Sequence, residues 1–148
     1  MRTILWIVGI AGGLALLGAV SGCGKGGSID SIAGEYRVDP VKSLEVIKET
    51  ARYKALPLEK KQEAQRIFAS VVAPNRLILA KDKLTVDVEG KEVVIPIEKA
   101  QKTENGCEIT GKAGQNPIKL GVRVVDTERI QFFMAGNPGL SEHIWKRL

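Results

Sequence analysis

Very few side chains in this chain could do nucleophilic or general-base chemistry: two cysteines, Cys23 and Cys107, and a single histidine, His143. Such chemistry needs a partner group within hydrogen-bond reach of the thiol or imidazole. Glu142 precedes His143, but successive side chains of a strand point to opposite faces, so this carboxylate would not orient the imidazole. We therefore predict that His143 is a surface or core-edge residue and that the chain has no catalytic residue and is not an enzyme. The remaining route to a familiar catalytic pair is a meeting of Cys107 with His143 across two strands.

The other cysteine, Cys23, closes an apolar run that carries no charge from Thr3 to Gly24. Arg2, the apolar stretch and the small residues at 21–22 supply the basic start, the hydrophobic region and the cleavage site of a signal peptide. The segment Val20-Ser21-Gly22-Cys23 resembles a bacterial lipobox, in which cleavage before the cysteine leaves its thiol carrying a diacylglyceryl group. This resemblance implies a lipoprotein with a signal peptide over residues 1–22 and lipidation of Cys23, and two or more acyl chains hold a protein stably on a membrane. An uncleaved membrane-spanning anchor is the alternative, because the same run could cross a bilayer.

Residues 23–31 are predicted to form the lipidated cysteine and a flexible tether, because positions 24–28 are rich in glycine. In Gram-negative lipoproteins an aspartate directly after the lipidated cysteine favours retention in the inner membrane, and Gly24 stands at that position here. The resemblance therefore implies an outer-membrane lipoprotein facing the periplasm in preference to an inner-membrane one. The membrane is the partner that it implies, reached through the lipid on Cys23.

With Cys23 acylated, Cys107 has no partner for an internal disulfide. Cys107 lies between Asn105 and Glu108, where a turn is expected to enter a strand. It is either a reactive or pairing thiol or, as we favour, a small half-buried residue. Neither a CxxC pair nor a histidine cluster accompanies it, and segment 111–114 lacks the spacing of a phosphate-binding loop. The sequence thus predicts no metal site and no cofactor.

The chain is mildly basic, with 22 Lys and Arg residues against 17 Asp and Glu and a formal net charge of +5. The basic residues are scattered among acidic ones, and no basic stripe interleaved with aromatic residues is present, so nucleic-acid binding is not expected. After removal of residues 1–22, the 148-residue chain keeps enough length for one domain with a single core, over residues 32–148.

Two helices are predicted directly after a first strand. Residues 32–38 contain an alternation of apolar and polar side chains that predicts the strand. Asp39-Pro40 then provides a helix N-cap and a proline at the first helical position. The apolar face of this helix carries Val41, Leu44, Ile47 and Ala51. A second helix is predicted from residue 57 to residue 72, and Pro74 ends it.

From residue 75 the period changes to two, which predicts a run of strands. The expected strands cover residues 77–80, 84–88, 93–97, 107–110, 118–124, 129–134 and 143–146. Pro96 marks an edge or a bulge, and loops or turns are expected at 101–105, 111–117, 126–127 and 136–139. The predicted fold class is α+β: an antiparallel β-meander that forms a barrel or half-barrel, with two helices inserted after the first strand. The predicted core joins helix and sheet residues: Leu44, Ile47, Ile67, Phe68, Val71, Leu84, Val86, Leu120, Val122 and Phe132.

This order of elements is similar to the small lipocalin-like or calycin-like domains found in bacterial lipoproteins. The resemblance is carried by Gly34-Glu35-Tyr36-Arg37-Val38-Asp39, by the meander, and by Trp145-Lys146-Arg147 in the last strand. The chain departs from true lipocalins, because Tyr36 stands where they have the tryptophan of Gly-x-Trp and because their disulfide partners are absent. This departure argues against carriage of a small hydrophobic ligand.

Two functions from different classes fit these observations. The first is a non-enzymatic binding or assembly module at the cell envelope, whose partner is an envelope protein, a small ligand or a cell-wall polymer. The second is a lipid-anchored inhibitor, in which the segment Gly136-Asn137-Pro138-Gly139 enters the cleft of a hydrolase. A hollow barrel would favour ligand binding, and a filled barrel with a rigid protruding loop would favour inhibition.

Overall fold

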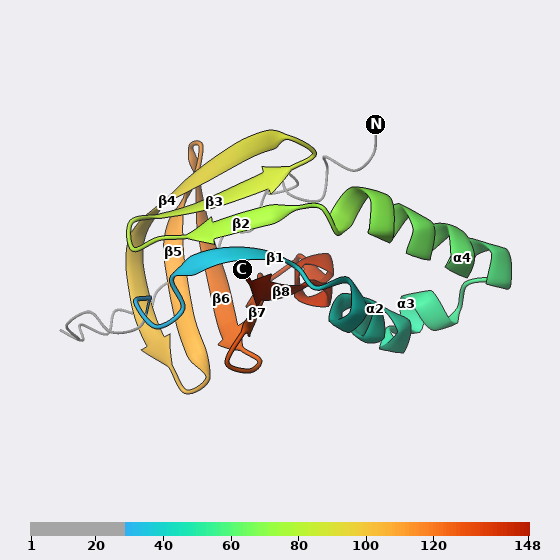
Figure 1. The fold of residues 1–148 in the computed structure, drawn as a ribbon. Helices are drawn as coiled ribbons and strands as arrows, with labels where there is room; N and C mark the ends of the chain where they lie inside the picture. Colours follow the sequence, from blue (N-terminus) through green and yellow to red (C-terminus); the bar gives the residue numbers. More distant parts are fainter. Residues whose placement is uncertain (1–28) are drawn as a thin grey trace.

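Eight antiparallel strands close into a barrel in which each strand pairs with the next in sequence and β1 pairs with β8. A computed structural model describes residues 29–148 (Figure 1). Closure confirms the predicted α+β meander and selects the barrel over the half-barrel, since it leaves no unpaired sheet edge. The strands are β1 Gly34–Val38, β2 Arg76–Leu79, β3 Lys83–Val88, β4 Lys91–Thr103, β5 Gly106–Ala113, β6 Asn116–Val124, β7 Arg129–Phe133 and β8 Ile144–Arg147.

The helices lie between β1 and β2, as predicted, and Figure 1 shows them grouped beside the barrel. The Asp39 side chain caps the first of them by accepting a hydrogen bond from the backbone N–H of Lys42 at 3.0 Å. Thr50 is extended, with ψ at 142°, and its hydroxyl caps a short extra helix, so the helical segment has three α-helices instead of two. The helices are α2 Pro40–Glu49, α3 Ala51–Lys54 and α4 Leu58–Ile67, continued by a π-helical turn over Phe68–Val72.

The long hairpin of β4 and β5 departs from the predicted loops. Residues 101–103 belong to β4, and residues 111–113 and 116–117 belong to β5 and β6, leaving a tight turn at Gly114, whose φ is +64°. Most of these positions are exposed to solvent and carry polar side chains. The alternation of apolar and polar residues that predicts a strand is therefore absent from them. The predicted irregularity at Pro96 is confirmed, since the register with β5 shifts between Ile97 and Lys99.

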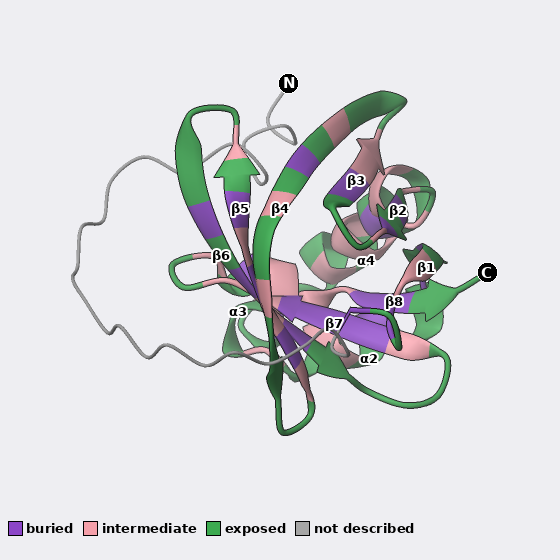
Figure 2. Cartoon of the chain, turned by 90° about the vertical axis from the view of Figure 1, so that its left-hand side faces the viewer, coloured by how far each residue is buried: buried purple, intermediate pink, exposed green. Residues whose placement is uncertain are grey.

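The interior of the barrel is filled with side chains. Its largest fully buried members are Tyr36, Phe132, Leu79, Ile109 and Cys107. In Figure 2, bands of buried and exposed residues alternate along β4 and β6, as expected for strands with one face in the core. An eight-stranded barrel is just wide enough for side chains to fill it, and this barrel follows that pattern.

Two segments close the ends of the barrel. Because β1 and β2 are antiparallel, the segments that precede them enter at opposite ends. Ile29 and Ile32 are buried in the core before β1, and Phe68 is buried in the core before β2. We call these the tether end and the helix end of the barrel.

Most of the predicted core is confirmed, and the helix positions carry the errors. Ile67 is 46% exposed and Val41 is 65% exposed, against the prediction that both lie on apolar packing faces. Val72, not Val71, packs against the core. The cause of the change from Val71 to Val72 is the π-helical turn, in which the N–H of Ala73 bonds to the carbonyl of Phe68 at 2.9 Å, because an i→i+5 bond shifts the 3.6-residue phase. The buried or partly buried predicted residues are Leu44, Ile47, Phe68, Leu84, Val86, Leu120, Val122 and Phe132.

Candidate functional site

The two side chains considered for nucleophilic chemistry lie at opposite ends of the barrel. Cys107 is the second residue of β5, at the tether end, and His143 precedes β8 at the helix end. Cys107 is fully buried, more than the half-buried position expected, and burial raises the pKa of its thiol to about 11. A thiol with that pKa is protonated and poorly nucleophilic at neutral pH. The structure therefore brings no Cys107–His143 pair together.

His143 is a core-edge residue, as predicted. Its ring lies 5.9 Å from the ring of Phe68, centroid to centroid, and burial lowers the pKa of the imidazole to about 4. The Glu142 carboxylate forms an ion pair with Arg52 of α3, so it does not orient the imidazole. The predicted strand start at residue 143 is one residue early, because a 3-10 helix over Pro138–Glu142 precedes β8.

The segment considered as an inhibitory loop is held against the barrel. Gly139 is buried within the 3-10 helix. The backbone carbonyl of Ser141 accepts a hydrogen bond from the side chain of Gln131 on β7. The Ser141 hydroxyl in turn donates to the carbonyl of Pro138 at 2.7 Å. These bonds make residues 138–142 a support for the outer face of β7.

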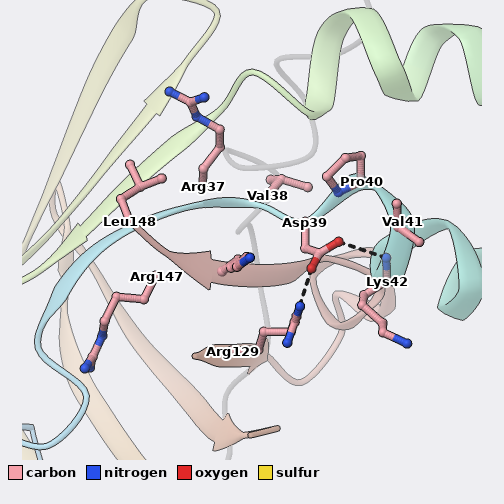
Figure 3. A pocket seen from close by; sticks show the side chains of 10 residues that line it. Arg37, Val38, Asp39, Pro40, Val41, Lys42, Arg129, Arg147 and Leu148 are labelled. Atoms are coloured by element: carbon pink, nitrogen blue, oxygen red, sulfur yellow. Dashed lines mark hydrogen bonds and ion pairs between the residues drawn. The ribbon is translucent and has the colours of Figure 1, made fainter. Parts of the chain in front are cut away.

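A groove of about 530 Å³ lies on the outside of the barrel, where β1, β8 and the start of α2 meet (Figure 3). We call it the basic groove. Its charged lining consists of one carboxylate, Asp39, and five basic side chains: Arg37, Lys42, Arg129, Lys146 and Arg147. A second, smaller hollow of about 340 Å³ is also at the surface, near Phe133 and Gly121.

Strand register places four basic side chains in one line across the outer wall. Arg37 of β1 lies opposite Arg76 of β2 on one side and Lys146 of β8 on the other, and Lys146 lies opposite Arg129 of β7. We call these four residues the basic row. Like charges directly opposite one another on neighbouring strands destabilise a sheet, so the row needs compensating acids or an external anion.

Asp39 compensates one end of the basic row. Its carboxylate accepts a hydrogen bond from the Nε of Arg129 at 2.8 Å, and Arg129 also binds Asp126 at 3.0 Å (Figure 3). Burial by itself would raise the pKa of Asp39, but the hydrogen bonds from Arg129 and from the backbone N–H of Lys42 outweigh it and lower the pKa. Asp39 is therefore ionised at neutral pH and joins β1, α2 and β7.

The other basic side chains are compensated less completely. Lys146 lies 3.7 Å from Glu128, Arg76 lies 3.8 Å from Glu35, and exposed pairs at such distances contribute little. In the described part of the chain, the Arg37 side chain, at the centre of the row, has no hydrogen bond or ion pair, and Figure 3 shows it directed away from Asp39. Arg37 is thus a cation that an external anion could bind.

Sequence reasoning missed this groove because it treated the basic residues as scattered. The signal that could have found it was the alternation in β1 and β8, which places Arg37 and Lys146 on the outer face. The pairing of the first strand with the last was also needed, and it became certain only once the barrel closed.

The predicted lipidation site Cys23 and the signal peptide 1–22 lie outside the described residues. Between residues 29 and 148 no helix is long and apolar enough to cross a membrane. In the same range no three side chains of His, Cys, Asp or Glu gather in a way that could hold a metal ion. Comparison with known proteins found no family model, curated sequence or solved structure that matches this chain.

Proposed function

We propose that this chain is a lipid-anchored, non-enzymatic binding or assembly module of the cell envelope, held in the outer membrane and facing the periplasm. Its partner is an envelope protein, a small ligand or a cell-wall polymer. The observation that carries the proposal is the filled barrel: Tyr36, Ile109 and Phe132 occupy the interior, and the groove and the smaller hollow lie on the outside. A partner would therefore bind the outer surface of the barrel or its helices.

The positions of the reactive groups support a role without catalysis. The Cys107 thiol is buried and protonated, and the His143 imidazole packs on Phe68 at the other end of the barrel. We expect the purified protein to give no turnover with esterase, peptidase, glycosidase and phosphatase reporters. Turnover that is lost in both Cys107→Ala and His143→Ala would make the protein an enzyme and overturn the proposal.

The anchoring part of the proposal depends on the lipobox-like segment that ends at Cys23. Cells that express the full chain would be labelled with a clickable fatty acid. We expect label on the wild type and on Cys107→Ser, but none on Cys23→Ser, because the Cys23 thiol is the acceptor. The two cysteine variants are matched, since each leaves one cysteine. Label that persists on Cys23→Ser would overturn the lipoprotein assignment.

The binding part would be tested by cross-linking the full chain in intact envelopes, followed by affinity capture. We expect a partner whose capture is weakened by changes on the outer surface, such as Arg37→Gln, and not by the interior change Ile109→Val. Capture that depends on the interior residue alone would indicate a ligand inside the barrel. The inhibitor alternative gains no support from segment 136–139, because Gly139 is buried and the adjoining residues are held against β7.

A further inference from the structure

The basic groove is amphipathic. Two of the most exposed large apolar side chains in the described residues, Val41 at 65% and Leu148 at 63%, line it together with the five cations. Val41 belongs to the first turn of α2, and Leu148 follows β8. Exposed apolar side chains beside basic ones are the composition of surfaces that bind the headgroup region of anionic membranes.

The chain that leads back to Cys23 contacts one edge of this groove, at Arg147. The guanidinium of Arg147 donates hydrogen bonds to the carbonyls of Ser31 at 3.1 Å and Ala33 at 3.3 Å. Ile29 lies six residues after Cys23, and an extended chain spans at most about 3.6 Å per residue. A lipid on Cys23 would therefore keep the start of the barrel, where Arg147 lies, within roughly 20 Å of the membrane. The edge of the groove that carries Val41 and Lys42 lies farther along, beyond the five residues of β1.

We propose that the basic groove binds an anionic lipid surface, and this inference rests on the lipid anchor of the proposed function. Arg37, Lys42 and Lys146 contact lipid phosphates, while Val41 and Leu148 enter the apolar boundary below the headgroups. Docking in this way orients the barrel on the membrane.

The acidic residues around the groove neutralise much of its positive charge, and this favours a lipid surface over a single soluble anion as the ligand. Glu45 pairs with Lys42 at 2.9 Å, Glu128 lies near Lys146, and Asp39 and Asp126 bind Arg129, so the free positive charge is small. One phosphate in solution would gain little from such a site. A tethered membrane supplies many phosphates at high effective concentration, together with an apolar layer for the two exposed side chains.

The test uses the full chain, reconstituted in vesicles through its N-terminal segment, acylated or not. Vesicles of phosphatidylcholine alone are compared with vesicles in which about a third of the lipid is phosphatidylglycerol. Lysines are acetylated briefly, and each site is quantified by mass spectrometry. We expect Lys42 and Lys146 to react several-fold more slowly on the anionic vesicles, and added salt to remove the difference. Lys60 on α4 and Lys112 on β5 are internal controls that react equally on both.

Two variants separate docking from a general charge effect. Val41→Asp should abolish the protection of Lys42 and Lys146, whereas Leu58→Asp, at a 71% exposed position on α4, should leave it unchanged. Equal reactivity on both kinds of vesicle would overturn the inference. If inorganic phosphate slowed the acetylation of Lys42 and Lys146 on neutral vesicles as much as the anionic vesicles do, the inference would be overturned in favour of a soluble anion. Because reconstitution does not require acylation, failure of this inference is distinguishable from loss of fatty-acid label at Cys23.

Discussion

Replacing Asp39 is the most informative change in this protein, because one carboxylate joins β1, the first turn of α2 and Arg129 on β7. Loss of an N-cap costs about 1 kcal/mol. Loss of a charge-assisted hydrogen bond costs about 1.5 to 3 kcal/mol, and the low end applies because Arg129 keeps Asp126 as a partner. The Asp39 side chain is only 9% exposed and the Arg129 side chain only 21%, so solvent screens the interaction between them weakly. We expect Asp39→Ala to lower the free energy of unfolding by about 2 to 3 kcal/mol.

Asp39→Asn separates the two contributions. Asparagine is as good an N-cap as aspartate, so this variant should lose only the ionic part, about 1 to 1.5 kcal/mol. Urea unfolding followed by circular dichroism would measure both variants. A double-mutant cycle with Arg129→Gln would give the coupling energy between the two side chains. Equal losses for Asp39→Ala and Asp39→Asn would refute the capping role, and a loss below about 0.5 kcal/mol for Asp39→Ala would refute the reasoning as a whole.

The pH dependence gives an independent check. The folded pKa of Asp39 is lowered from its ordinary value of 3.8, so its contribution is fully present above that value. The contribution is lost as the pH falls through the lower folded pKa. The difference in stability between wild type and Asp39→Ala should therefore be constant from neutral pH down to about pH 5 and shrink below pH 4. A difference that does not change down to the acid limit would contradict this account.

Three further predictions test the core. Gly111→Ala would place a Cβ 2.2 Å from the carbonyl oxygen of Pro96, so it should destabilise by about 1 to 3 kcal/mol in urea unfolding, whereas Gly121→Ala, whose nearest contact is at 3.6 Å, should be tolerated. The imidazole of His143 has a folded pKa of about 4 against an ordinary value of 6.5, so the stability of the wild type should decline as the pH drops between these values, and a pH series on His143→Gln should lack that decline. The indole N–H of Trp145 is buried without an acceptor in the described residues, so Trp145→Phe should lose packing contacts but no hydrogen bond and should cost about 1 to 2 kcal/mol in urea unfolding; a loss as large as that expected for truncation to alanine, about 3 to 5 kcal/mol, would contradict this account.

The fold was predictable because local signals agreed with the tertiary structure. The Asp39-Pro40 pair set the start of α2, and Pro96 marked the irregularity in β4. The errors fall where tertiary structure overrides the local period. The π-helical turn after Ile67 changes the helical phase, and polar residues 101–103 extend a strand whose side chains face solvent. Neither event leaves a clear mark in hydropathy.

The candidate site was harder to predict, because its residues come from β1, α2, β7 and β8 and meet only through register. Lys146 lies opposite both Arg37 and Arg129, which are 92 positions apart in the chain. The sequence indicated a mild excess of basic residues with no basic stripe, and the basic residues are indeed scattered along the chain. Across the strands, the same residues form a row, so the relevant charge pattern is perpendicular to the chain direction.

The two segments that carried the resemblance to lipocalin-like domains explain both the filled interior and the basic groove. Closure of the barrel pairs Tyr36 with Arg147 and Arg37 with Lys146. Of the inward pair, only Tyr36 is buried in the barrel, while the exposed Arg147 guanidinium lies 5.5 Å from the Tyr36 ring centroid and donates to its hydroxyl at 3.0 Å. The outward pair forms the centre of the basic row. Because side chains alternate strictly along a strand, one register produces both effects. A slip of one residue between β1 and β8 would bury the outward cations and expose the aromatic ring, so the packing of the core enforces the position of the surface charges.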